Sequence, residues 1–217
     1  MRPPSGVRTP RGMSGVASLT AESKAPARTG VIMLARHGEP ALSRKVRLSA
    51  AEYRDWWARY EIGGLREGQS PPPALLAFAK DAGAIICSTR PRAHQTAQAV
   101  ACEREFSCEE AFIEAPLPPP NWPSWMKLSP RAWGFIARTW WWFFDHHEGQ
   151  ETRRQAQVRA DSAAERLIVL AEEGRDVLVM AHGFFNAMVG MSLRKRGWRL
   201  ADDQGFGYWS ARRYERG

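Results

Sequence analysis

Three short apolar runs in the sequence each end on a stretch that contains arginine or histidine. The runs and the stretches that follow them are Val31–Ala35 with Arg36–Glu39, Ala84–Cys87 with Ser88–Arg92, and Asp176–Met180 with Ala181–Gly183. Histidines, arginines and a carboxylate are the groups that covalent phosphoryl transfer needs. One neutral imidazole attacks phosphorus, the arginines stabilise the charge on its oxygens, and a carboxylic acid protonates the leaving oxygen. Because the cationic side chains supply the positive charge, we expect no metal or other cofactor.

These stretches would meet if the three runs were parallel strands of one sheet, because ligands of open α/β sheets bind beyond the carboxyl ends of the strands. Glu114, at the end of the weaker run Ala111–Glu114, would join them. Buried cationic groups repel one another unless a counter-ion is present, and a phosphate dianion would fit the planar donors of arginine. The glycines beside both histidines let the backbone approach closely. Amides of a helix that starts at Gly183 would add donors for the anion.

The elements that position these groups follow from hydrophobic periodicity and capping signals, which predict an α/β fold with a mostly parallel sheet. Ser49 and Glu52 form a capping box at the start of the first helix. The predicted helices run from Ser49 to Gly63, Pro73 to Asp81, Arg92 to Glu103, Pro130 to His147, Glu151 to Glu173 and Gly183 to Arg196. The alternating C-terminal segment 206–215 is predicted to be a last, edge strand.

Composition limits the class of protein. The chain has 217 residues, of which 44% are hydrophobic, and its formal net charge is +8. This length suits one domain, and no apolar run approaches the roughly 18–20 residues of a membrane span. A basic protein attracts nucleic acid, anionic lipid or phosphorylated substrates. The basic residues are scattered and do not alternate with the aromatic ones as in a base-stacking surface, so we expect no nucleic-acid partner.

The cysteines and the N-terminal residues indicate in which cellular compartment the protein is expected. Cys87, Cys102 and Cys108 fit neither a zinc pattern nor a disulfide framework, so we interpret them as buried structural thiols of a cytoplasmic protein. Residues 1–29 are rich in Pro, Gly, Ser, Thr and Arg, which predicts a disordered leader before a single domain at residues 30–217. A transit peptide is the alternative for this leader.

An aromatic segment at residues 121–147 contains six tryptophans and three phenylalanines. Ordinary packing is one interpretation. A second is a lid insertion, at about residues 115–148, which would favour a phosphorylated small-molecule substrate with an apolar or aromatic part. A third is a membrane-surface or homodimer contact. Adjacent histidines on a helix do not face one another, so His146 and His147 are not expected to bind a metal.

Taken together, the motifs resemble those of the histidine phosphatase superfamily, in its phosphoglycerate-mutase-like branch. The similar stretches are Arg36–Glu39, the segment from Ser88 to Ala97, Ala181–Gly183 and, before the long helix, Gly149–Glu151. They occur in the family's order and cover most of the chain after the leader. The resemblance implies a three-layer α/β/α sandwich of the phosphoglycerate-mutase type.

Roles for individual residues follow from the same resemblance. His37 corresponds to the phosphorylated nucleophile, with Arg36, Arg92 and His182 as phosphate-binding residues. Glu114 corresponds to the proton donor, and His182 is counted among the catalytic residues. The candidate substrate contacts are Ser43, Arg44 and Gly183; for Arg44 a solvated loop position is the alternative.

The resemblance also bears on the reaction. Ser43 stands where many members carry asparagine, and residues 40–45 lack the asparagine-rich and Thr-Gly-Trp segments that follow the first motif of glycolytic mutases. These departures favour a metal-independent phosphatase that hydrolyses a phosphomonoester through a phosphohistidine. A phosphomutase and a catalytically idle protein that binds a phosphorylated ligand are the alternatives.

Overall fold

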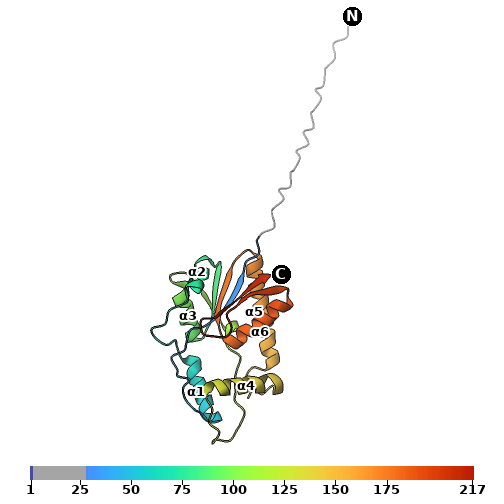
Figure 1. The fold of residues 1–217 in the computed structure, drawn as a ribbon. Helices are drawn as coiled ribbons and strands as arrows, with labels where there is room; N and C mark the ends of the chain where they lie inside the picture. The colour runs from blue at the N-terminus through green and yellow to red at the C-terminus, as the bar shows by residue number, and fades with distance from the viewer. Residues whose placement is uncertain (2–27) are drawn as a thin grey trace.

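Six strands of the described residues form one sheet in the order β3-β2-β4-β1-β6-β5 (Figure 1). The computed structural model describes Met1 and residues 28–217, so the predicted leader lies almost wholly outside the described residues. The strands are β1 Ile32–Arg36, β2 Ala84–Ser88, β3 Ser107–Glu109, β4 Val177–Ala181, β5 Trp198–Asp203 and β6 Ala211–Arg216. The first four in the order pair in parallel, and β6 pairs antiparallel with both neighbours. The predicted mostly parallel sheet is confirmed.

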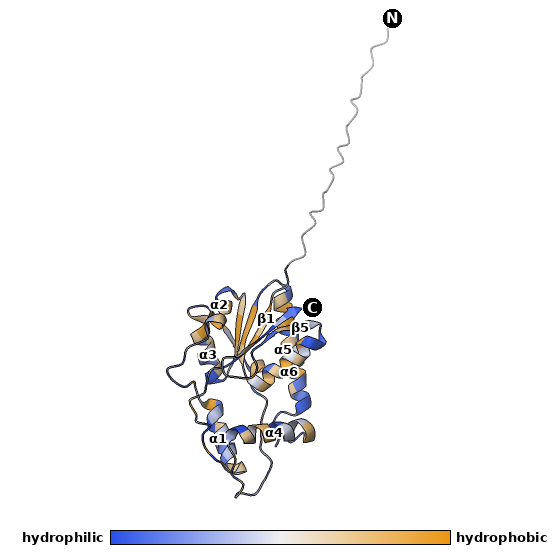
Figure 2. Ribbon diagram, viewed as in Figure 1, coloured by the Kyte–Doolittle hydropathy of each residue, from blue (hydrophilic) through white to orange (hydrophobic). Residues whose placement is uncertain are grey.

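Helices cover both faces of this sheet. Helices α2 Pro73–Asp81 and α3 Pro91–Ala101 cover one face, and α5 Arg153–Glu172 and α6 Gly183–Lys195 cover the other. The remaining helices are α1 Ala50–Ile62 and α4 Pro130–Phe144. Successive residues of β4 point to opposite faces: Val177 and Val179 pack against α5 and α6, whereas Leu178 and Met180 pack against α2 and α3. Figure 2 shows the apolar strands between these helices. The α/β/α sandwich implied by the resemblance is therefore present.

Two helices, α1 and α4, form a separate layer below the carboxyl ends of the strands (Figure 1). Their own apolar cluster contains Tyr53, Trp56, Tyr60 and Trp133, all at most 2% exposed. Trp133 also donates its indole N–H to the Leu48 carbonyl oxygen at 2.6 Å. This layer contains most of the aromatic segment, so ordinary packing explains part of that segment.

Other aromatic side chains of the segment face outward. Trp125, Phe135 and Phe143 are 76%, 72% and 73% exposed. Trp141 is fully buried and packs with the sheet cluster instead. The interpretation of the segment as core is therefore correct for some of its rings and wrong for others. No helix within the described residues combines the length and apolar character needed to cross a bilayer.

The predicted strand at 111–114 is wrong. The third strand is Ser107–Glu109, and Glu110–Phe112 is a 3-10 turn. The apolar side chains misled the prediction because Phe112 is buried in the main cluster from the turn. The strand itself has the polar sequence Ser-Cys-Glu because it lies at the sheet edge.

The C-terminal segment also differs from its prediction. It contains two strands, and β6 lies inside the sheet between β1 and β5, whereas β5 forms the edge. The predicted strand began too early, because residues 204–210 form a turn between β5 and β6. The predicted helix ending near His147 stops at Phe144, because Asp145 adopts a left-handed conformation with φ 50°.

The expectation of three buried thiols holds only for Cys87. Cys102 and Cys108 are exposed. Cys108 belongs to the edge strand β3, and Cys102 follows the last residue of α3. The position on a sheet edge and at a helix end gives these two side chains access to solvent.

This topology positions the polar stretches found in the sequence. The adjacent strands β2, β4 and β1 run parallel and therefore end at the same edge of the sheet. Their carboxyl ends lead to Ser88–Arg92, to His182 and to His37, respectively. The sheet order thus brings together three motifs that are far apart in the chain.

Candidate active site

His37 is the first residue beyond β1, and its side chain is held in one tautomer. Its Nδ1 atom lies 2.7 Å from the Gly38 carbonyl oxygen. A carbonyl oxygen only accepts hydrogen bonds, so Nδ1 carries the proton and Nε2 keeps its lone pair. Nε2 accepts from Nε of Arg92 at 3.3 Å. The free lone pair makes Nε2 the nucleophilic atom of this ring.

His182 precedes α6 and lies against His37. The two ring centroids are 5.2 Å apart in an edge-to-face arrangement. Nδ1 of His182 lies 3.3 Å from Nη2 of Arg92, and Nε2 lies 2.9 Å from the Ser88 hydroxyl oxygen. Since a guanidinium only donates, Nδ1 accepts and Nε2 carries the proton. The rings of His37 and His182 are 2% and 1% exposed.

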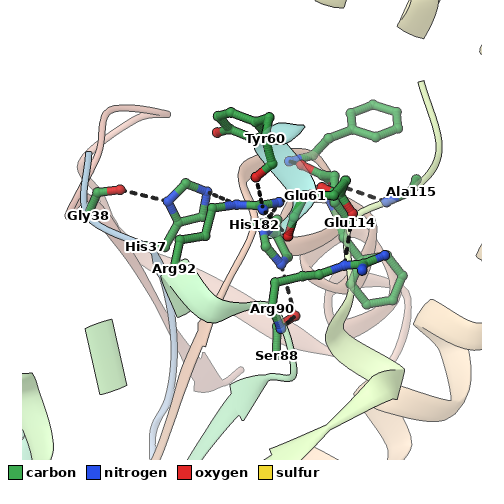
Figure 3. Close-up of polar contacts among 12 residues, drawn as sticks. His37, Gly38, Tyr60, Glu61, Ser88, Arg90, Arg92, Glu114, Ala115 and His182 are labelled. Carbon is green, nitrogen blue, oxygen red and sulfur yellow. Dashed lines mark hydrogen bonds and ion pairs between the residues drawn. The ribbon is translucent and has the colours of Figure 1, made fainter. Parts of the chain in front are cut away.

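Arg92 joins the two histidines from the first turn of α3, where it is fully buried. Figure 3 shows its bonds. Beyond the two imidazoles, its Nη1 atom donates to the carbonyl oxygens of Tyr60 and Glu61 at 2.9 and 3.3 Å. Its Nη2 atom also donates to the Glu61 carboxylate at 2.7 Å. A guanidinium has five N–H donors, and these bonds use all five. An anion can bind Arg92 only by displacing one of them.

Glu61 is the internal counter-ion of this cluster. Besides its bond to Arg92, its carboxylate lies 2.8 Å from Nε of Arg90, and its side chain is 15% exposed. The sequence analysis considered only a phosphate dianion as the counter-ion, whereas the folded chain supplies one of its own. Glu61 lies in the last turn of α1, where a negative charge is unfavourable to the helix dipole. That unfavourable position was the available signal in the sequence.

Both histidines are neutral near pH 7. Burial lowers the pKa of His37 well below the ordinary value of 6.5, and the positive charge of Arg92 lowers it further. The same two causes, in the same order, lower the pKa of His182. Burial penalises the charged form, and a nearby cation adds to that penalty. A neutral imidazole is the form that can act as a nucleophile.

Arg36 lies on the open side of the cluster. Its guanidinium carbon is 4.5 Å from the ring centroid of Tyr208, and its Nη1 atom donates to the Phe206 carbonyl oxygen. Burial lowers the pKa of Arg36. A Cβ atom on Gly183 would lie 3.3 Å from Cδ of Arg36, so the glycine leaves room for this side chain. Arg44 is near by and donates to the Tyr60 hydroxyl at 3.1 Å.

Glu114 belongs to the loop after the 3-10 turn, and its side chain contacts the first turn of α6. Its carboxylate accepts from the backbone N–H groups of Phe185 at 2.8 Å, Phe184 at 3.4 Å and Ala115 at 3.2 Å. These two α6 amides are the donors that we expected to hold an anion. In the described structure the Glu114 carboxylate occupies them.

Two residues singled out in the sequence have other contacts in the structure. Ser43 is exposed, and its hydroxyl accepts from the Lys45 amide at 3.1 Å. Gly38 leaves room for a neighbouring ring, because a Cβ atom there would lie 2.5 Å from Trp209. The sequence interpretation also missed Tyr60 and Tyr208, because nothing in their local sequence indicates that they contact Arg44 and Arg36.

Two cavities border the cluster, and both are lined by Trp57 and Leu117. One, of about 680 Å³, is also lined by Glu61, Arg90 and Glu114 among others. The other, of about 550 Å³, is also lined by Arg36 and Gly183 among others. One cavity therefore contains the acids next to the cluster, and the other contains Arg36.

Comparison with known proteins agrees with this arrangement. The family model of the histidine phosphatase superfamily (branch 1) matches residues 73–210, which include Arg92 and His182 and begin after His37. A phosphoserine phosphatase from Entamoeba histolytica, in complex with 3-phosphoglyceric acid, is 16% identical with a TM-score of 0.50, over 85% of this chain and 89% of that one.

YhfR from Bacillus stearothermophilus is 19% identical with a TM-score of 0.51, over 76% of this chain and 80% of that one. At these identities the structures show a shared fold. No curated protein matches the chain.

Proposed function

Since the chain belongs to branch 1 of the histidine phosphatase superfamily, we propose that it is a metal-independent phosphatase that forms a phosphohistidine on His37. The observation that carries this proposal is the Arg92 guanidinium, which donates to Nε2 of His37 and to Nδ1 of His182 in a buried site. A shared cation between two neutral imidazoles suits a phosphoryl group better than any other common substrate group.

In the proposed first step, the lone pair on Nε2 of His37 attacks the phosphorus of a phosphomonoester. The bond from phosphorus to the ester oxygen breaks, and protonated Glu114 gives its proton to that oxygen. Arg36, Arg92 and His182 stabilise the charge that builds on the other phosphoryl oxygens, and the Nε2 proton of His182 leaves the Ser88 hydroxyl to do so. The neutral alcohol then leaves.

In the proposed second step, water attacks the phosphohistidine. The Glu114 carboxylate takes a proton from the water, the bond between nitrogen and phosphorus breaks, and Nε2 regains its lone pair. Glu114 must exchange its bonds to the α6 amides during this cycle, because a protonated oxygen no longer accepts from them in the same way. The net reaction is hydrolysis of a phosphorylated small molecule.

The test is hydrolysis of p-nitrophenyl phosphate in the presence of EDTA, with wild type and the His37→Ala variant. We expect His37→Ala to lower kcat by at least about 10³-fold, because removal of a nucleophile eliminates the covalent route. His94→Ala is the matched control, since His94 lies exposed on α3. Equal activity of wild type and His37→Ala would exclude the mechanism.

A rapid quench without acid separates the alternatives. A labelled phosphoenzyme in wild type, absent from His37→Ala, is the expected result. Dependence of turnover on a doubly phosphorylated primer would instead identify a phosphomutase. Phosphate-competitive binding with no turnover and no phosphoenzyme would identify a binding protein.

A further inference from the structure

The cavity of about 550 Å³ on the Arg36 side has an unusual lining. Four of its lining residues are arginines, namely Arg36, Arg44, Arg131 and Arg138, and none is Asp or Glu. We call it the arginine cavity. Only Arg36 is adjacent to the nucleophile in sequence; Arg131 and Arg138 both come from α4.

The charges of these four arginines are not neutralised within the described residues. Described carboxylates form no salt bridge with any of them. Arg36, Arg44 and Arg138 are half-buried and Arg131 is exposed, whereas the other half-buried or buried arginines of the described residues pair with carboxylates. Arg138 donates only to the Gly134 carbonyl oxygen, and Arg44 donates to the Tyr60 hydroxyl. Nε atoms of Arg36 and Arg44 are buried without an acceptor. A concave wall with one sign of charge focuses the field and attracts anions.

The cavity of about 680 Å³, which shares Trp57 with the arginine cavity, has a different charge distribution. Its carboxylates Glu148 and Glu151 are paired with Arg54 and Arg159 at 2.6 Å in each case. Glu61 is paired with Arg90 and Arg92. An anionic substrate would meet carboxylates there and unpaired cations in the arginine cavity. The leaving group of a phosphomonoester is therefore expected on the Arg36 side. Glu114 would reach the ester oxygen from the first turn of α6, where its carboxylate accepts from the amide of Phe184, a residue that lines the arginine cavity.

Aromatic rings form most of the remaining lining of the arginine cavity. Lining rings include Trp56 and Trp57 of α1, Phe135 of α4 and Phe184 of α6. The guanidinium of Arg138 lies 5.5 Å from the ring centroid of Phe184. Rings provide flat apolar surface for a ligand, and a cavity of this size matches those that hold small molecules. The site therefore combines apolar walls with positive charge.

We propose that the arginine cavity binds the leaving group of the substrate, and that this group carries a second anion on an apolar or aromatic body. Arg131 and Arg138 are the specificity-determining residues for that second anion. This assignment rests on the proposed function for the position of the phosphoryl group near Arg36. The second anion is a carboxylate or a phosphate, which share the guanidinium chemistry.

Hydrolysis of matched esters tests the proposal. The esters are phenyl phosphate, 4-carboxyphenyl phosphate and 1,4-phenylene bisphosphate. We expect wild type to favour the anionic esters by about tenfold in kcat/KM, as one added charge-assisted contact allows. In the Arg131→Gln/Arg138→Gln double variant this preference should fall toward unity. Arg154→Gln, an exposed arginine of α5, is the control and should keep the preference.

The ratio of kcat/KM for 4-carboxyphenyl phosphate to that for 1,4-phenylene bisphosphate shows which anion the cavity prefers. Equal kcat/KM for neutral and anionic esters in wild type would overturn the proposal. A preference that persists in the double variant would also overturn the assignment to Arg131 and Arg138.

A binding experiment separates this proposal from the phosphatase assignment. Calorimetry would compare phenylphosphonate with 4-carboxyphenylphosphonate, neither of which can be hydrolysed. Tighter binding of the carboxylated compound, lost in the double variant, supports the anion site even if no ester is hydrolysed. Hydrolysis of all esters together with equal binding of both phosphonates would keep the phosphatase and remove the anion site.

Discussion

At the scale of single residues, an anion that binds at the site must compete with protein groups for the N–H donors of Arg92. All five of its N–H groups are used by His37, His182 and the last turn of α1. The Glu61 carboxylate therefore accepts the Arg92 hydrogen bond that a bound phosphoryl oxygen would accept. Its contribution is twofold, because it neutralises a fully buried guanidinium and it opposes the entry of another anion.

The Glu61→Gln variant separates these two contributions. Loss of the negative charge should lower the free energy of unfolding, since Arg92 keeps its buried charge without a counter-ion. The same loss should tighten the binding of inorganic phosphate by roughly three- to tenfold, because an anion then supplies the missing charge. Thermal unfolding with and without phosphate measures both effects.

Exposed Glu103 gives the matched control for this experiment. Glu103→Gln should leave both the melting temperature and the phosphate response as in wild type. If phosphate stabilises the Glu61→Gln variant no more than wild type, Glu61 does not compete for the anion.

At the scale of elements, α1 and α4 are a unit that packs apart from the two sheet clusters. Their cluster shares none of its buried members with the clusters on either face of the sheet. The layer nevertheless supplies Tyr60 and Glu61 to the cluster around Arg92, and Arg131 and Arg138 to the arginine cavity. The packing of this layer therefore sets how firmly those four residues are held.

Trp133→Ala should loosen this layer selectively. Removal of a fully buried tryptophan costs about 3–5 kcal/mol where the neighbours cannot collapse into the space, and it also removes the bond to Leu48. Hydrogen exchange should accelerate in α1 and α4 while the amides of β4 stay protected. Trp125→Ala is the control, because Trp125 is 76% exposed. Equal loss of protection in β4 would show that layer and sheet unfold together.

At the scale of the whole molecule, the two buried histidines connect the site to the stability of the fold. Their pKa values are lowered well below 6.5 in the folded protein. Below that pH the unfolded chain binds protons at these positions and the folded protein does not. The unfolded state therefore gains relative stability, and the free energy of unfolding decreases as the pH falls.

This linkage predicts that a plot of the free energy of unfolding against pH has a measurable slope below pH 6.5. Each neutral buried histidine contributes about 1.4 kcal/mol per pH unit at pH values well below 6.5. The His37→Asn and His182→Asn variants should each reduce the slope by about that amount, whatever their stability at pH 7.5. Urea unfolding between pH 7.5 and pH 5 gives the slopes. Identical slopes in wild type and both variants would show that the histidines do not cause the loss.

Features that depend on neighbouring residues could be predicted from the sequence alone. The capping box of Ser49 and Glu52 is present, with its two bonds at 2.7 and 3.4 Å. The predicted helix Pro73–Asp81 has the observed bounds, and the run Ala84–Cys87 lies within β2. Periodicity and capping act over a few residues, so they can be read along the chain. The strand-end motifs were found for the same reason.

Contacts between distant residues could not be predicted in this way. Glu61 and Arg92 are 31 residues apart, and nothing local to Glu61 specifies the guanidinium that it binds. The polar edge strand Ser107–Glu109 has no apolar pattern, and β6 became an inner strand because it pairs with both β1 and β5. Such contacts arise from the order of strands and the packing of layers. That order brings together side chains whose mutual attraction acts only across the folded molecule.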